Sequence, residues 1–145
     1  MTLLSSSASL VNDKLQFTGT AGAHPPVVID YIPPLGDGAG YMSLQLLLMS
    51  LASCAGSAVV TLLRRMGRKI DGFTVHASGE RREQHPTSFS GITLEFVVQS
   101  PDVQEADVRK AIAMSEATLC PVWDMLQGNV EIGTTVRILA SPEER

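Results

Sequence analysis

The sequence predicts an α+β fold, and three observations support this class. Residues 43–66 form one long apolar segment with the length and hydropathy of a central helix. Runs of alternating apolar and polar residues, which are typical of strands, occur before and after it. The strands and helices do not alternate regularly, as they would in a doubly wound parallel sheet. Because 145 residues suit one compact domain, we expect a single domain over residues 1–145.

The composition narrows the classes of function. Hydrophobic residues make up 44% of the chain and charged residues 18%, which supports a folded core and excludes a disordered chain. The net charge of −4 disfavours nucleic acids and anionic membranes, so we expect neither as a partner. The two cysteines and three histidines lack metal-ligand spacing, and phosphate-binding and dinucleotide motifs are absent. We therefore expect no bound metal and no bound cofactor.

The first elements of the chain are strands. Residues 13–32 hold two loosely alternating apolar runs and predict two strands, which prolines and glycines over residues 33–40 bring to an end. The long helix follows, with Ser43 as the expected N-cap and its last turn at about Met66. Gly67 is the expected C′ residue, because helices commonly end in a left-handed glycine.

The same helix is long enough to cross a membrane. No charged residue occurs from Gly38 to Leu63, and basic residues follow, as in many membrane spans. Its serines, threonine and glutamine instead favour the buried central helix of a soluble protein. Because no export signal precedes it, we expect a cytoplasmic protein that does not enter the membrane. A helix of about 36 Å needs extensive covering surface, which a second copy of the chain would supply.

The pattern changes to a period of two after the helix. Residues 73–77 and 92–98 alternate as two strands, and the charged segment 80–86 reads as the connection between them. A last alternating run over residues 130–138 predicts one more strand near the end of the chain. These strands would complete a sheet against the long helix.

Two further helices are expected between these strands. Residues 100–102, Ser-Pro-Asp, combine a capping residue, a first-turn proline and a first-turn acid, and so predict the start of a second helix. Helical spacing of apolar residues continues until Cys120, where the following proline interrupts it. A short third helix is predicted from Pro121 to Leu126.

The two cysteines are the candidate reactive groups. Cys54 lies in the middle of the long helix, where a free cysteine more often packs than reacts. Cys120 is the expected N-cap of the third helix, where the helix dipole would stabilise a thiolate and make this the more acidic thiol. In a reducing compartment such a pair is more often redox-active or unpaired than a permanent disulfide. The sequence leaves open whether the two sulfur atoms meet.

Three segments give the sequence a family resemblance. Residues 41–63 resemble the central helix of the OsmC/Ohr family, the osmotically inducible and organic hydroperoxide resistance proteins, which carries a cysteine near its middle. Residues 71–98 resemble the hairpin and the following strand of that family. Residues 115–125, SEATLCPVWDM, resemble the segment around its second cysteine. The three segments occur in the order that the family shows.

The resemblance implies a fold, an assembly and a reaction. The implied fold has antiparallel sheets wrapped around long central helices in an intertwined homodimer. In the implied reaction, Cys54 attacks the O–O bond of an organic hydroperoxide and becomes a sulfenic acid, which condenses with Cys120 to a disulfide. An external dithiol, such as a lipoylated protein, would then reduce that disulfide. The family thus gives the attacking role to Cys54 rather than to Cys120, and we follow the family.

Two positions differ from the active peroxidases of the family. Their activating arginine comes from the N-terminal half, but this chain has no arginine before Arg64, and His24 is the candidate substitute. Their glutamate near the start of the central helix falls at about Gln45, which carries no charge. Gln45 and His24 are therefore the expected auxiliary residues. The departures favour a second interpretation, a non-catalytic dimer that is redox-responsive or binds a small apolar ligand.

Overall fold

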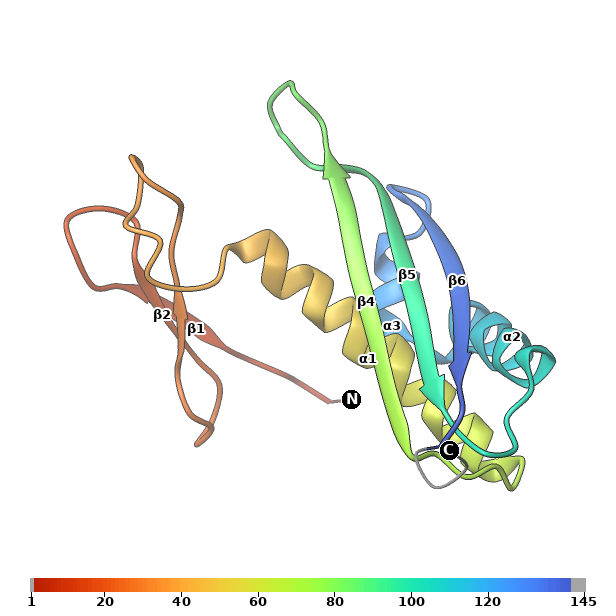
Figure 1. Ribbon diagram of the computed structural model, residues 1–145. Helices are drawn as coiled ribbons and strands as arrows, with labels where there is room; N and C mark the ends of the chain where they lie inside the picture. The colour runs from red at the N-terminus through yellow and green to blue at the C-terminus, as the bar shows by residue number, and fades with distance from the viewer. Residues whose placement is uncertain (1, 142–145) are drawn as a thin grey trace. The chain divides into compact units, whose positions relative to one another are not determined.

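The computed structural model describes residues 2–141, which divide into two compact units. The first unit reaches to Leu47 and the second begins at Leu48. Each unit contains one three-stranded sheet, and the three helices belong mainly to the second unit. Figure 1 labels most of the elements along the chain. The mixture of sheets and helices confirms the predicted α+β class.

The sheet of the first unit is small and antiparallel. It consists of β1 (Ser7–Leu10), β2 (Phe17–Thr20) and β3 (Val27–Ile29), paired in that order. β2 and β3 lie within residues 13–32, where two strands are predicted. β1 escapes prediction because it is only four residues long and all four, SASL, are exposed, which is too short a run to establish a strand pattern.

A buried carboxylate organises the loop that follows β3. Asp30 accepts hydrogen bonds from the backbone N–H groups of Ala39 (3.0 Å), Tyr31 (2.8 Å) and Asp37 (3.2 Å). These bonds, with that from Ala39 as the largest contribution, lower the pKa of Asp30. A Cβ at Gly36 would lie 2.3 Å from the carbonyl oxygen of Tyr31, so only glycine fits there. The loop therefore has one defined path between the small sheet and the next helix.

Helix α1 (Ser43–Arg65) agrees closely with the long helix expected from the sequence. Ser43 is its first helical residue rather than its cap, and the side-chain oxygen of Gln45 instead accepts the backbone N–H of Met42 (2.8 Å). Gly67 has a φ of 80° and ends the helix as predicted. By length and composition alone α1 could cross a membrane, but Leu51, Ala55, Val59 and Leu63 on one of its faces are fully buried in the core.

The sheet of the second unit is mixed. β4 (Gly72–Arg81) pairs antiparallel with β5 (Phe89–Gln99), which pairs parallel with β6 (Glu131–Leu139). The parallel pair departs from the antiparallel sheets that the family resemblance implies. It arises because the chain between β5 and β6 crosses over through helices, which brings it back to the same end of the sheet. The crossover contains α2 (Glu105–Met114), the π-helical turn η1 (Ser115–Leu119) and α3 (Pro121–Leu126).

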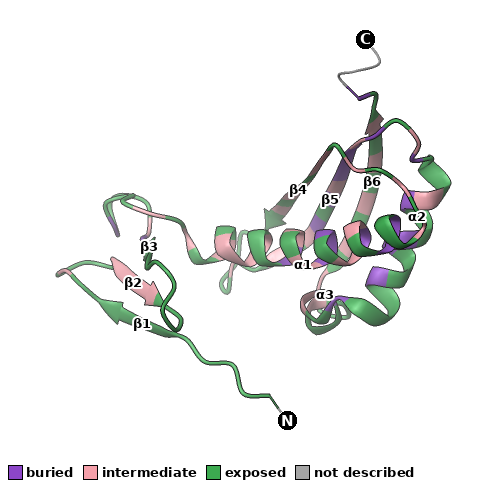
Figure 2. Ribbon diagram, turned by 90° about the horizontal axis from the view of Figure 1, so that it is seen from below, coloured by how far each residue is buried: buried purple, intermediate pink, exposed green. Residues whose placement is uncertain are grey.

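The helices cover one face of this sheet, and the core lies between the two layers (Figure 2). Leu94, Phe96 and Val98 of β5 alternate toward the helices and are fully buried, as the period-two pattern predicts. Trp123 of α3 is 1% exposed and is the largest fully buried side chain. The same core includes Cys120, so the candidate reactive thiol is also a packing residue.

The second helix starts later than its sequence signal indicates. α2 begins at Glu105, with Gln104 as the N-cap residue. The Ser-Pro-Asp segment at residues 100–102 therefore does not cap a helix. The prediction fails because a serine followed by proline and an acid is equally suited to closing a tight turn.

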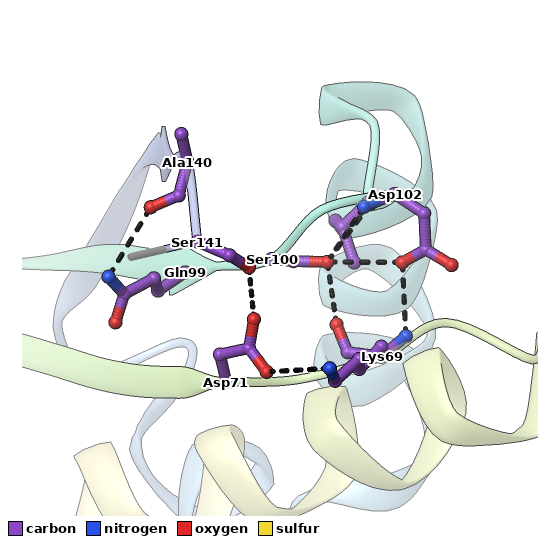
Figure 3. Close-up of polar contacts among 8 residues, drawn as sticks. Lys69, Asp71, Gln99, Ser100, Asp102, Ala140 and Ser141 are labelled. Carbon is purple, nitrogen blue, oxygen red and sulfur yellow. Dashed lines mark hydrogen bonds and ion pairs between the residues drawn. The ribbon is translucent and has the colours of Figure 1, made fainter. Parts of the chain in front are cut away.

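That turn is held by the side chain of Ser100, which is buried. Its Oγ accepts the backbone N–H groups of Asp102 (3.2 Å) and Val103 (3.1 Å). It also lies 2.6 Å from the carbonyl oxygen of Lys69, to which it donates. Figure 3 shows how this group joins the segment after α1 to the segment after β5. Further contacts nearby involve Asp71, Gln99, Ala140 and Ser141.

Candidate active site

The structure brings the two cysteines together. Cys54 lies in the middle of α1, Cys120 lies directly before α3, and both are free thiols. The side chains of Cys54 and Cys120 lie close enough to interact, and this interaction contributes to the raised pKa of the Cys120 thiol. Both residues take part in the packing of the same core. The two side chains are therefore neighbours, although they lie 66 positions apart in the sequence.

The π-helical turn η1 positions Cys120 over α1. Ser115, the first residue of η1, is fully buried, and its Oγ lies 3.5 Å from the carbonyl oxygen of Ala55, to which it donates. Ala55 is the neighbour of Cys54, so this contact holds the two cysteine-bearing segments in register. The chain then leaves the helical conformation at Cys120, with a φ of −96°. Sequence reasoning missed this role of Ser115, because helical spacing alone does not reveal a widened turn.

Cys120 is the N-cap of α3, as predicted, but its acidity is not as predicted. Its Sγ accepts the backbone N–H of Trp123 at 3.4 Å. Burial, followed by the hydrogen bond with Cys54, nevertheless raises the pKa of the Cys120 thiol to about 11. The predicted stabilisation of a Cys120 thiolate is therefore wrong. Moving a thiolate from water into the core costs more free energy than its interaction with the N-terminus of a six-residue helix contributes.

Cys54 is the more accessible of the two thiols. It is half-buried, whereas Cys120 is only 2% exposed. A groove of about 700 Å³ runs along the neighbouring face of α1 and β4, although Cys54 itself does not line it. The residues of α1 and β4 that line this groove are Met49, Ala52, Ser53, Gly56, Ser57, Val60, Thr61, Arg64, Phe73, Thr74 and Val75.

Both expected auxiliary residues lie in the first unit. The side-chain oxygen of Gln45 is engaged with the backbone of Met42 at the start of α1. His24 is exposed in the connection between β2 and β3 and lines a groove of about 480 Å³ on the small sheet. Their roles toward Cys54 stay predictions. Over residues 2–141, no group of three or more His, Cys, Asp or Glu side chains could hold a metal ion.

Known proteins share this sequence pattern and this fold. The sequence profile described as OsmC-like protein matches residues 36–135. Protein YhfA of Escherichia coli (strain K12) is 30% identical over 98 residues, which are 68% of this chain and 73% of that protein.

Solved structures of the same fold cover nearly the whole chain. An OsmC-like protein from Mycoplasma pneumoniae superposes with a TM-score of 0.82 at 20% identity, covering 95% of this chain and 98% of that one. An organic hydroperoxide resistance protein from Elizabethkingia anophelis superposes with a TM-score of 0.71 at 18% identity, covering 95% and 97%. The extent of the sequence match, together with this shared fold, establishes that the chain belongs to the OsmC-like protein family.

Proposed function

We propose that the protein is a thiol-dependent peroxidase that reduces organic hydroperoxides in the cytoplasm. The observation that carries the proposal is the side-chain contact between Cys54 and Cys120. Cys54 is the better exposed thiol, which suits the group that meets the peroxide. Cys120 is buried beside it, which suits the group that closes a disulfide. The family membership and a structural neighbour described as an organic hydroperoxide resistance protein support the same substrate class.

The proposed reaction takes place in two steps. The Cys54 thiolate attacks one oxygen of the hydroperoxide, the O–O bond breaks, and the alcohol leaves after taking a proton. Cys54 is then a sulfenic acid, oxidised by two electrons. The Cys120 sulfur attacks the Cys54 sulfur, the S–O bond breaks, and water leaves with the proton of the Cys120 thiol. An external dithiol supplies the two electrons that restore both thiols.

The second candidate function is a non-catalytic dimer that is redox-responsive or binds a small apolar ligand. It is favoured by the lack of any arginine before Arg64 and by Gln45, whose side chain is uncharged and already bound at the start of α1. Without an adjacent cation, a thiolate at Cys54 is less stabilised. The reaction of the protein with a hydroperoxide therefore distinguishes the peroxidase from the non-catalytic dimer.

The peroxidase proposal is tested by adding one equivalent of cumene hydroperoxide to the reduced protein and measuring intact mass. The wild-type chain is expected to lose two hydrogens as it forms the disulfide. The Cys120→Ser variant is expected to gain one oxygen, because its Cys54 sulfenic acid cannot be resolved, and Cys54→Ser is expected to stay unchanged. With dithiothreitol present, turnover by Cys54→Ser should fall at least about a hundredfold. Hydroperoxide consumption by the wild type no faster than by the double variant would leave the non-catalytic dimer as the function.

We further propose that the working form is a homodimer in which a second copy covers the groove on α1. The helix has a mean hydropathy of 2.1 over its most apolar window, yet only 33% of that window is buried within one chain. The hydroxyls of Ser57 and Thr61 on the open face donate to carbonyls of their own helix, at 2.7 and 2.8 Å. They therefore need no water, and their small side chains permit close approach of a second helix.

A charge on the open face of α1 is expected to break the homodimer. Sedimentation of the wild type should give the mass of two chains, whereas Ser57→Glu should weaken association at least about tenfold, because symmetry would bury two charges. Ser78→Glu adds the same charge on the exposed face of β4 and should leave the mass unchanged. A wild type that sediments as one chain, or a Ser57→Glu variant that still dimerises normally, would contradict the proposal.

A further inference from the structure

A second groove reaches Cys120 from outside the core. It has a volume of about 490 Å³ and is lined by residues 116–121 and Asp124, all from η1, α3 and the junction between them. Cys120 lines this groove although it is only 2% exposed. The groove therefore borders the one cysteine of the pair that does not attack the peroxide.

The direction of the groove suits attack on a disulfide. A thiolate displaces a sulfur from the side opposite the bond that breaks. Cys54 lies on α1, and no residue of α1 lines the groove. A reductant within the groove would therefore come next to Cys120 without contacting α1, which carries Cys54.

We propose that a small, uncharged aliphatic dithiol reduces the Cys54–Cys120 disulfide from this groove by attacking the Cys120 sulfur. Cys54 is then the leaving thiolate. This proposal rests on the proposed function in one respect, namely that the two cysteines form a disulfide during the catalytic cycle. It adds the site of reduction and the order of the two exchange steps, whereas the dithiol class of the reductant is the one that the family resemblance already implies.

Both exchange steps balance. One thiolate of the dithiol bonds to the Cys120 sulfur, the S–S bond breaks, and its electron pair leaves on Cys54, which takes up a proton. The second thiol of the dithiol then loses its proton and attacks the reductant's own sulfur in the mixed disulfide. Cys120 leaves and is protonated, and the dithiol is released as a cyclic disulfide. The protein gains two electrons and two protons in total.

Leaving-group chemistry explains why this order favours a dithiol. Burial raises the pKa of Cys120, and a thiol with a high pKa is a poor leaving group in disulfide exchange. Attack at Cys54 would expel Cys120 in the step between two separate molecules. Attack at Cys120 defers that departure to the second step, which is intramolecular for a dithiol and so gains from its high effective concentration. A monothiol lacks this advantage and should stop at the mixed disulfide on Cys120.

The lining of the groove indicates an uncharged reductant. Glu116 and Asp124 are exposed and place two carboxylates on it, whereas its other side chains include Ala117, Leu119 and Pro121. The carboxylates repel an anionic thiol such as glutathione. The aliphatic side chains can contact the carbon chain of a short dithiol.

The attacked sulfur can be identified by trapping. The protein is first oxidised with diamide rather than a hydroperoxide, so that disulfide formation does not depend on peroxidase activity. It is then mixed briefly with 2-mercaptoethanol, quenched in acid to stop thiol exchange, and digested. We expect the probe on the peptide containing Cys120 at least about tenfold more often than on that containing Cys54. An excess on Cys54, or equal labelling, would overturn the proposal.

The charge selectivity is tested with the doubly substituted Glu116→Gln/Asp124→Asn chain. At low salt, its reduction by glutathione should be faster than that of the wild type by about three- to tenfold, whereas reduction by dithiothreitol should change less than about twofold. The matched control is Glu80→Gln/Glu131→Gln, which makes the same charge change on another surface of the sheet. An equal gain in this control, or none in the groove variant, would contradict an approach through the groove.

The two proposals fail in distinguishable ways. If diamide forms the disulfide and labelling follows Cys120, but hydroperoxide forms none, the peroxidase function fails and the site of reduction stands. If hydroperoxide forms the disulfide but the label follows Cys54, the peroxidase stands and the site of reduction fails. A chain that forms no intramolecular disulfide with either oxidant would overturn both.

Discussion

The Cys120 thiol of a Cys54→Ser variant is expected to react with a small aromatic disulfide about five hundred to a thousand times faster at pH 10 than at pH 7. Only the thiolate attacks a disulfide, and burial, the larger cause, raises the pKa of Cys120 to about 11. The thiolate fraction then grows about tenfold per pH unit across this whole range. The serine hydroxyl keeps a hydrogen-bonding group beside Cys120, and the substitution removes the competing thiol.

The same variant unfolded in urea provides a matched control. An ordinary thiol with a pKa of about 8.5 is already mostly ionised at pH 10, so its rate should rise only about thirtyfold over the same interval. The two ratios differ enough for absorbance of the released thiol to separate them. A folded chain whose rate rises no more than that of the unfolded chain would show that burial does not hold the proton on Cys120.

The raised pKa also fixes the sign of the effect of pH on stability. The folded chain retains a proton on Cys120 that the unfolded chain releases, so the free energy of unfolding falls as the pH rises from the ordinary thiol value toward 11. Circular dichroism should therefore confirm folding at each pH before the rates are compared. Ionisation of Cys120 would also affect the proposed reaction, because the resolving thiol of a peroxidase would form the disulfide faster at alkaline pH.

The sequence determines the local elements of this fold well. α1 was predictable because an unbroken apolar run sets its length and Gly67 marks its end. β4 and β6 were predictable because partly buried residues alternate with exposed ones along them, and β5 because Ile92, Leu94, Phe96 and Val98 repeat with a period of two. In all these cases the deciding interactions lie within a few residues along the chain.

The chemistry at the site depends on contacts that no local pattern records. The partnership of Cys54 with Cys120 is formed by η1, whose widened turn leaves no distinct mark in the spacing of apolar residues. The acidity of Cys120 was mispredicted because the helix start is local, whereas the burial that outweighs it comes from distant elements. Serine at position 100 presents the same limitation, since its bonds to the N–H groups of Asp102 and Val103 resemble those of a helix cap, whereas its bond to the carbonyl of Lys69 joins a distant segment.

Replacement of Trp123 by alanine is expected to lower the free energy of unfolding by about 3–5 kcal/mol. Trp123 is 1% exposed and is the largest side chain enclosed by the core, so its removal leaves a cavity that the surrounding elements cannot fill completely. A domain of this size is stable by only about 5–15 kcal/mol, and the loss is a large part of that. Guanidinium unfolding followed by far-ultraviolet circular dichroism measures it, because the variant lacks the only tryptophan.

Two further variants serve as controls for the Trp123→Ala result. Met125→Ala, on the same helix but 68% exposed, should change the free energy of unfolding by less than about 0.5 kcal/mol. Trp123→Phe should cost less than Trp123→Ala and remain folded, which allows the thiol to be examined. Since α3 carries Cys120 at its start, a looser core should admit water and lower the pKa of that thiol, so that it reacts faster at neutral pH. A Trp123→Ala chain as stable as the Met125→Ala chain would show that the core does not depend on the indole ring. Unchanged reactivity of Cys120 in the Trp123→Phe chain would show that the indole ring does not shield the thiol.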